Sequence, residues 1–190
     1  MTTLTASPLL ASSMATRSAD PTFRIALIST GGTIEKTYNE SDGTITNQRS
    51  VLEIMLAGLV LHGVRIERIA VMNKDSLLMT SDDHDAIVDA VERALVTHAG
   101  VVITHGTDRL QYSGERLVAR LGATLQHPVI LTGAMRPYEL RTTDALQNLT
   151  EALLAVQIAP PGVYVAMHNE VLRFPGVVKD VERMRFVRAP

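Results

Sequence analysis

Short apolar runs alternate with longer segments of helical spacing along most of this 190-residue chain, and this alternation limits the fold more than any other feature. The apolar runs are continuous, as expected of buried parallel strands that helices cover on both faces. We expect strands at residues 23–29, 64–72, 101–104, 128–132 and 162–167. Helices are expected at residues 51–61, 110–121 and 143–156, and in a segment that is capped at residues 80–83 and continues to residue 95. The alternation predicts an α/β fold of three layers, a mostly parallel sheet with helices on both faces.

The first 22 residues differ from the rest, because nine of them are Ser or Thr and their only charged side chains are Arg17 and Asp20. Such a segment has little apolar surface to bury, so we expect a disordered extension over residues 1–22 and one folded domain over residues 23–190. No basic residue precedes the weak apolar patch at residues 9–11, which argues against a secretory signal and favours a cytoplasmic protein. A targeting role and a later start at Met14 are the alternatives.

Composition excludes several classes of function. The chain has no cysteine, so disulfides, Cys-ligated zinc, iron–sulfur clusters and thiol nucleophiles are excluded. A net charge of −2, no tryptophan, four tyrosines and three phenylalanines argue against a nucleic-acid partner. No apolar run reaches the roughly 18 residues of a membrane-spanning helix, so no membrane partner is expected. The end of the chain, residues 173–188, has five basic residues against Asp180 and Glu182, which is typical of a solvated face.

Polar residues and glycines follow each predicted strand. In open α/β sheets ligands bind beyond the carboxyl ends of the strands, which here directs attention to five loops. These loops are residues 30–33, 73–76, 105–108, 133–137 and 168–170. Hydroxyls, carboxylates and glycines therefore collect at one edge of the predicted sheet.

Two of these loops suggest chemistry. Gly31 and Gly32 permit close approach to a ligand, although a simple turn would also explain them. A phosphate-binding P-loop is excluded because the required glycine is absent, and no dinucleotide fingerprint is present. Thr107 and Asp108 place a hydroxyl beside a carboxylate, and a threonine becomes a nucleophile when a base such as a neutral lysine takes its proton. Either residue could instead cap the following helix, and the two roles are compatible. His105 has no second ligand at helical spacing, so we expect it to brace the loop and expect no metal.

Four segments in chain order carry a family resemblance. Residues 28–34 (ISTGGTI) and 102–108 (VITHGTD) resemble the two active-site motifs of the bacterial-type L-asparaginases. Residues 131–137 (LTGAMRP) and 143–149 resemble two further segments of that family. The resemblance implies a flavodoxin-like catalytic domain and a threonine-dependent double displacement, which converts L-asparagine to L-aspartate and ammonia.

The resemblance also implies roles for particular side chains. Thr33 and Thr107 match the two threonines of the family, and the sequence leaves open which of them attacks first. Asp108 and Lys179 match the partners of Thr107 in a triad, and the arginines near Lys179 cannot act as bases. Tyr38 is matched to a tyrosine that works with the first threonine. Substrate-binding positions are expected at Ser76, which matches the serine that holds the α-carboxylate, and at Asp75, Gly32 and Gly106.

Three departures from the family pattern bear on the substrate. Arg109 stands where the family has a small hydroxyl residue, so it is expected either to face solvent or to attract the substrate carboxylate. Leu77 and Leu78 replace polar residues that often follow the serine. Family members carry a second C-terminal domain, and we expect this chain to be a short one-domain form with a more open site.

These considerations predict an L-asparaginase that needs no metal and no cofactor. The partner is a small-molecule substrate, L-asparagine, and a homo-oligomer, a dimer or tetramer, is expected. Two alternatives stay open. One is a glutaminase or another amidohydrolase of broader substrate range. The other is a catalytically weak amino-acid-binding regulatory module.

Overall fold

The computed structural model describes residues 22–189, and all but the last residue of the predicted extension lies outside this range. The strands are β1 Phe23–Gly31, β2 Thr37–Tyr38, β3 Ile45–Thr46, β4 Val64–Lys74, β5 Gly100–Thr104, β6 Pro128–Thr132, β7 Gly162–Met167, β8 Glu170–Arg173, β9 Val177–Asp180 and β10 Arg185–Arg188. The α-helices are α1 Leu52–Ala57, α2 Ser81–Leu95, α3 Leu110–Leu121 and α4 Ala145–Ile158. Two short 3₁₀ turns, η1 Thr33–Glu35 and η2 Ser76–Leu78, follow β1 and β4.

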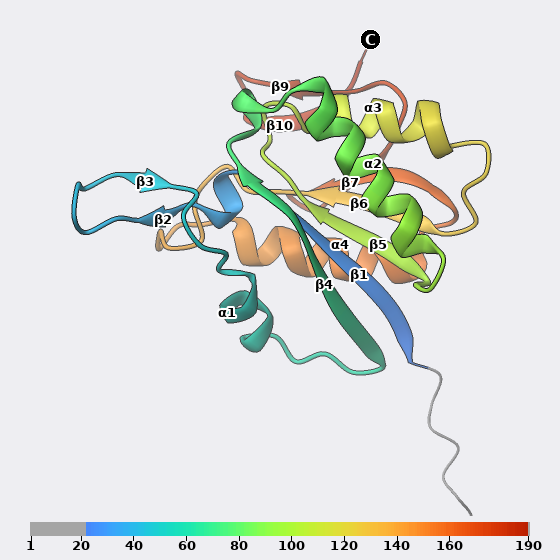
Figure 1. Cartoon of the computed structure of the whole chain (residues 1–190), viewed down its shortest axis with the longest axis horizontal. Helices are drawn as coiled ribbons and strands as arrows, with labels where there is room; N and C mark the ends of the chain where they lie inside the picture. Colours follow the sequence, from blue (N-terminus) through green and yellow to red (C-terminus); the bar gives the residue numbers. More distant parts are fainter. Residues whose placement is uncertain (1–21, 190) are drawn as a thin grey trace, which may run out of the picture.

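A six-stranded sheet in the order β4-β1-β5-β6-β7-β8 forms the centre of the molecule (Figure 1). Its first five strands are parallel, and β8 adds to the β7 edge as an antiparallel strand. Numbered along the chain, the parallel strands have the order 2-1-3-4-5, which is that of the flavodoxin-like doubly wound fold. The predicted fold class is therefore confirmed.

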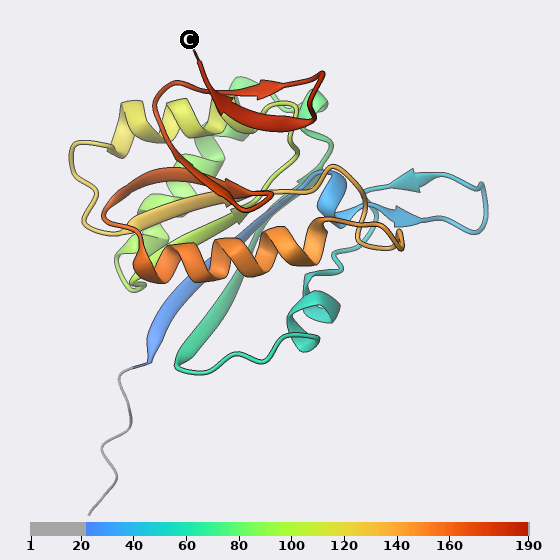
Figure 2. The same cartoon turned by 180° about the vertical axis from the view of Figure 1, so that it is seen from behind.

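Helices cover both faces of this sheet (Figures 1 and 2). One face packs against α2 and α3, and alternate residues of β1 and β5 such as Ile28 and Ile103 lie in that core. The opposite face packs against α1 and α4, with Leu27 and Val102 pointing into the second core. Because both faces are buried, the central strands are apolar over most of their length, which explains the apolar runs in the sequence.

The elements lie close to their predicted places, with local differences at the ends. α1 stops at Ala57, because Gly58 ends it well before the predicted limit. α2 has the expected cap: the Thr80 hydroxyl accepts from the Asp83 N–H, and the Asp83 carboxylate accepts from the Thr80 N–H. β4 continues to Lys74, so its carboxyl end leads directly into Asp75.

Two hairpins were not expected from the sequence. The β2–β3 hairpin projects from the body of the molecule (Figure 2). The β9–β10 hairpin occupies the basic end of the chain, where the charge pattern suggested only a solvated face. Val177 and Phe186 of this hairpin are buried in the core on the α2–α3 side, so the segment is anchored by apolar side chains between its charges. Within the described residues, no helix is long and apolar enough to cross a membrane.

Candidate active site

The topological switch of the sheet lies between β1 and β5, because the chain leaves these neighbouring strands toward opposite faces. Ser29 of β1 and Thr104 of β5 are in register, so the loops that follow start from the same edge. Ligands of doubly wound folds bind at such a switch point. The two loops that the sequence singled out, with Thr33 and Thr107, therefore meet where a ligand site is expected.

Close backbone contacts bring three loops together at this edge. Gly32 has a φ of 77°, and a Cβ on it would overlap the main-chain nitrogen of Gly106. A Cβ on Gly106 would in turn lie 2.5 Å from Ser76 Oγ. The loops after β1, β5 and β4 are thus stacked in van der Waals contact, and only glycine fits at both middle positions.

Thr107, Asp108 and Lys179 form a directly bonded group. Lys179 Nζ lies 2.8 Å from Thr107 Oγ1 and 2.7 Å from an oxygen of the Asp108 carboxylate. Thr107 is buried, and the Lys179 side chain is only 10% exposed, whereas that of Asp108 is 43% exposed. A buried hydroxyl therefore touches an amine that an accessible carboxylate orients, which is the arrangement of a nucleophile, a base and a third group that orients the base.

Helix α3 holds both halves of this group. Thr107 and Asp108 lie just before its first turn, and its side chains reach across to the strand that carries Lys179. The Gln111 side-chain oxygen accepts from the Lys179 N–H at 2.9 Å, and a Glu115 carboxylate oxygen accepts from the Gly176 N–H at 2.6 Å. Gln111 and Glu115 are four positions apart in the helix, so they share one of its faces. These two supports were not predicted from the sequence, because their target is a hairpin that the sequence pattern did not indicate.

Thr33 and Tyr38 lie on the other side of the switch point. Thr33 begins the η1 turn and is half-buried, and its hydroxyl has no hydrogen-bond partner among the described residues. Tyr38 is 55% exposed on the projecting β2–β3 hairpin, and its main-chain N–H donates to Glu139 Oε2 at 2.6 Å. In the described part of the chain no hydrogen bond joins the Tyr38 phenol to Thr33 or Thr107. The role given to Tyr38 stays a prediction.

Ser76 and Asp75 border the same space from β4. Ser76 is 1% exposed, yet its hydroxyl has no hydrogen-bond partner in residues 22–189. A buried polar group without a partner is costly, and it is a common mark of a ligand position. The Asp75 carboxylate accepts from Lys36 Nζ at 2.7 Å and from the Leu77 N–H at 3.0 Å. The Lys36 contact holds the pKa of Asp75 below its ordinary value and ties the Thr33 loop to the Ser76 loop.

The main-chain N–H and carbonyl of Gly32 both form hydrogen bonds within the protein. Its N–H donates to the Lys74 carbonyl at 2.8 Å, and its carbonyl accepts from the Asn47 side chain at 2.8 Å. Gly32 therefore shapes the site by close packing, and a direct bond from its main chain to a substrate stays a prediction.

A buried relay of hydrogen bonds supports Gly106. His105 Nδ1 lies 2.8 Å from the Gly106 carbonyl and its Nε2 lies 2.8 Å from Ser113 Oγ, which is 2.7 Å from His84 Nδ1. Complete burial lowers the pKa of His105 to about 4, so the ring is neutral at pH 7. Because a carbonyl only accepts, the Nδ1 of His105 carries its proton and the Ser113 hydroxyl donates to Nε2. His105 thus braces the loop, with Ser113 and His84 behind it.

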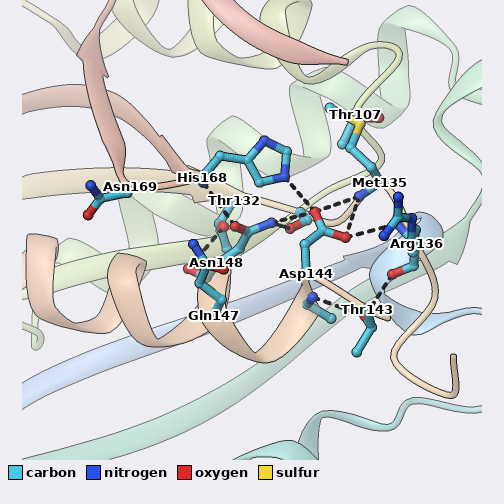
Figure 3. A network of polar contacts seen from close by, with 12 residues as sticks. Thr107, Thr132, Met135, Arg136, Thr143, Asp144, Gln147, Asn148, His168 and Asn169 are labelled. Carbon is cyan, nitrogen blue, oxygen red and sulfur yellow. Dashed lines mark hydrogen bonds and ion pairs between the residues drawn. The ribbon is translucent and has the colours of Figure 1, made fainter. Parts of the chain in front are cut away.

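The loop after β6 closes the site from the next strand (Figure 3). The Asp144 carboxylate accepts hydrogen bonds from the main-chain N–H groups of Met135 and Arg136, from Asn148 Nδ2 and from His168 Nε2. Burial alone would raise the pKa of Asp144, but these bonds lower it overall.

This network fixes the segment that begins at Gly133, where a Cβ would approach the Thr107 methyl group to 3.3 Å. A pocket of about 230 Å³ adjoins the network and is lined by Met135, Arg136, Asp144, His168 and Met184.

The residues that depart from the family pattern, Arg109, Leu77 and Leu78, lie in different parts of the site region. An Arg109 guanidinium N–H donates to the Met79 carbonyl at 3.0 Å, and the side chain lines the groove between α2 and α3. It thus supports the segment after Ser76 and also borders an open groove. Leu77 and Leu78 are 59% and 73% exposed, so they give this edge of the molecule an apolar rim. No group of three or more metal-ligating side chains occurs in the described residues.

Comparison with known proteins agrees with this architecture. The family model described as "Asparaginase, N-terminal" matches residues 24–183. An L-asparaginase from Thermococcus kodakarensis is 33% identical over 150 residues, which are 78% of this chain and 45% of that protein. The solved structure of the thermostable L-asparaginase from the same organism is similar with a TM-score of 0.74 at 34% identity, over 83% of this chain and 48% of that chain.

A second group of relatives has a different name. One glutamyl-tRNA(Gln) amidotransferase subunit, from Aeropyrum pernix, is 34% identical over 152 residues, which are 77% of this chain and 35% of that protein. The chain thus spans less than half the length of these curated relatives.

Proposed function

From this chain's membership of the asparaginase family, which the match over residues 24–183 shows, we propose that it hydrolyses the side-chain amide of L-asparagine to L-aspartate and ammonia. The observation that carries the proposal is the contact of Lys179 Nζ with both Thr107 Oγ1 and the Asp108 carboxylate. A threonine hydroxyl is a poor nucleophile until a base takes its proton, and this contact supplies the base at hydrogen-bond distance.

The reaction proceeds through an ester in two steps. A threonine oxygen attacks the amide carbon, the C–N bond breaks, and the departing nitrogen takes a proton to leave as ammonia. Water then attacks the ester carbon, the bond to the threonine oxygen breaks, and the hydroxyl regains its proton. Lys179 Nζ accepts the Thr107 proton, and the Asp108 carboxylate stabilises the ammonium that forms.

The two threonines divide these steps between them. Thr107 is the threonine in contact with Lys179, so in its step the proton passes between the Thr107 hydroxyl and Lys179. The unpartnered hydroxyl of Thr33, on the loop that follows β1 at the same sheet edge, serves the other step. We place Tyr38 with Thr33 as its predicted partner, on the strength of the family resemblance alone.

Substrate recognition is assigned to the loops after β4 and β5. The buried, unpartnered hydroxyl of Ser76 binds the α-carboxylate, and the free oxygen of Asp108 binds the α-amino group. Asp75 orients the Ser76 turn through its bond to the Leu77 N–H, and Gly32 and Gly106 let the loops approach closely enough to form the pocket.

A second candidate substrate follows from the relatives named as amidotransferase subunits. Such a name and the exposed rim formed by Leu77 and Leu78 favour a broader amidohydrolase that also accepts glutamine or the amide of a larger molecule. Rates of ammonia release from asparagine, glutamine and short asparaginyl peptides separate these candidates, because each predicts a different best substrate.

Ammonia release from L-asparagine by the purified protein tests the activity, and no release from any of these amides would refute it. The attacking threonine is found by mass spectrometry of the Thr33→Ala and Thr107→Ala variants after mixing with substrate. The variant that still forms the ester carries it on the threonine that attacks. Since all proposed steps use side chains of this protein, activity is expected to persist in a chelator.

The wider setting of the reaction is also proposed. We expect a cytoplasmic homo-oligomer, a dimer or tetramer, that acts on a small-molecule substrate without a nucleic-acid or membrane partner. Light scattering on a sizing column measures the assembly, and cell fractionation measures the location. A monomer or a secreted protein would contradict these two expectations.

A further inference from the structure

Glu35 is a buried carboxyl group that the proposed reaction does not use. It is 1% exposed and lies in the η1 turn, two residues after Thr33. Glutamate is almost never fully buried without polar partners, because removing a carboxylate from water is costly. Its side chain accepts a hydrogen bond from the Thr104 hydroxyl at 3.1 Å.

The groups that face Glu35 come from separate parts of the fold. Thr104 is the last residue of β5, Gly31 is the last residue of β1, and Ser50 lies just before α1. Burial raises the pKa of Glu35, while the hydroxyls of Ser50 and Thr104, the Gly31 main chain and the charge of Arg68 act against that rise. Donors from three segments thus converge on one side chain beside the switch point.

The Thr104 contact has a particular geometric consequence. Thr104 precedes Thr107 by three residues, and its carbonyl accepts from the Thr30 hydroxyl at 2.8 Å. The bond from Thr104 to Glu35 therefore joins the turn that begins with Thr33 to the strand that leads into Thr107. In the described part of the chain it is the only side-chain hydrogen bond between η1 and β5.

We infer that Glu35 is a positioning residue, which sets the separation of the Thr33 and Thr107 hydroxyls by fastening the η1 turn to β5 through Thr104. The inference rests on the proposed function, since it takes both threonines to act in the reaction. Other bonds of the Thr33 loop reach different partners: Lys36 binds Asp75, and Asn47 binds the Gly32 carbonyl. Those bonds hold the loop on β4 and on the following hairpin, whereas Glu35 holds it on the strand of the second threonine.

A pair of matched variants tests this role. Thr104→Val removes the hydroxyl that links Glu35 to β5 and keeps the shape of the side chain. Ser50→Ala removes another Glu35 partner that links to neither threonine. A misplacement of about 1 Å in a reacting group costs about 100-fold in rate. We expect kcat to fall at least about tenfold in Thr104→Val with KM within about threefold, and to stay within about twofold in Ser50→Ala.

Three further variants separate an effect on position from an effect on folding. Glu35→Gln keeps an oxygen that accepts from Thr104, so kcat is expected to stay near that of the wild type, whereas Glu35→Ala is expected to lower it as Thr104→Val does. Thr104→Ser keeps the hydroxyl and is expected to restore kcat. Melting temperatures are measured for all five variants, and a purely structural role predicts that kcat follows the melting temperature.

The outcomes are distinguishable. If Thr104→Val and Ser50→Ala lower kcat equally, or if neither lowers it, the positioning role is refuted while the proposed activity stands. If the wild-type protein releases no ammonia from any amide, both the proposed function and this inference fail. If Thr104→Val lowers kcat and Thr104→Ser restores it at unchanged KM, the role is supported.

Discussion

Replacing Lys179 by methionine tests the centre of the proposed mechanism. Methionine has a similar length and fills the same space without a titratable nitrogen, and the lysine side chain is 10% exposed. The change removes both short contacts of Nζ, to Thr107 and to Asp108. General base catalysis contributes about 10²- to 10⁴-fold to a rate, so we expect kcat for asparagine hydrolysis to fall by that factor.

The stability of this variant should change little. The Asp108 side chain is 43% exposed, so water solvates its carboxylate once Lys179 Nζ is removed, and the loss of such a hydrogen bond costs about 0.5–1.5 kcal/mol. For a protein of this size that corresponds to a few degrees of melting temperature, about 2–4 °C per kcal/mol. Steady-state ammonia release and a thermal melt on the same sample measure the two quantities.

Lys179→Arg is the matched control, because arginine keeps the positive charge but cannot give up its proton. If Lys179 is the base, the arginine variant loses activity as the methionine variant does. If arginine restores activity, the residue acts through its charge alone and the proposed proton transfer is wrong. A loss of activity that follows a large fall in melting temperature would equally refute the reasoning.

Three shorter predictions follow from the same geometry. Gly106→Ala places a Cβ 2.5 Å from Ser76 Oγ, so activity should be lost and the melting temperature should fall, as a melt and an ammonia assay will show. Ser76→Ala removes a buried hydroxyl with no internal partner among the described residues, so KM for asparagine should rise at least about tenfold with stability unchanged or increased. The pKa of Asp144 is lowered in the folded state, so its contribution to stability is present above the ordinary carboxyl pKa of about 4 and is lost as the pH falls through the folded value. Asp144→Asn should weaken that acid dependence in melts measured against pH, and an unaltered dependence would count against the assignment.

The sheet was predictable because its physical cause is local. Burial on both faces requires continuous apolar strands, so β5, β6 and β7 could be located nearly to the residue. The cap of α2 could also be predicted from the sequence, because the Thr80 and Asp83 side chains form hydrogen bonds with main-chain groups nearby in the chain. The β9–β10 hairpin could not be predicted in the same way, because its strands are only four residues long and contain charged residues, and only Val177 and Phe186 of the two strands are buried in the core.

Part of the candidate site could likewise be predicted from the sequence. The register of β1 with β5 brings the Thr33 and Thr107 loops together, and the resemblance pointed to Lys179. The contacts of Glu35 and Ser113 could not be foreseen from the sequence, because each depends on packing between segments far apart in the chain. No pattern in the sequence shows that the Glu35 carboxylate meets Thr104.

Helix α3 gives the candidate triad a simple mechanical basis. Its start carries Thr107 and Asp108, while Gln111 and Glu115 on one of its faces hold the strand of Lys179. Residues and side chains of one helix therefore hold all three members of the group together. Thr33 is held differently, through Glu35 to β5 and through Lys36 to Asp75. The distance between the two threonines thus depends on the sheet edge, whereas the distance from Thr107 to its base depends on α3.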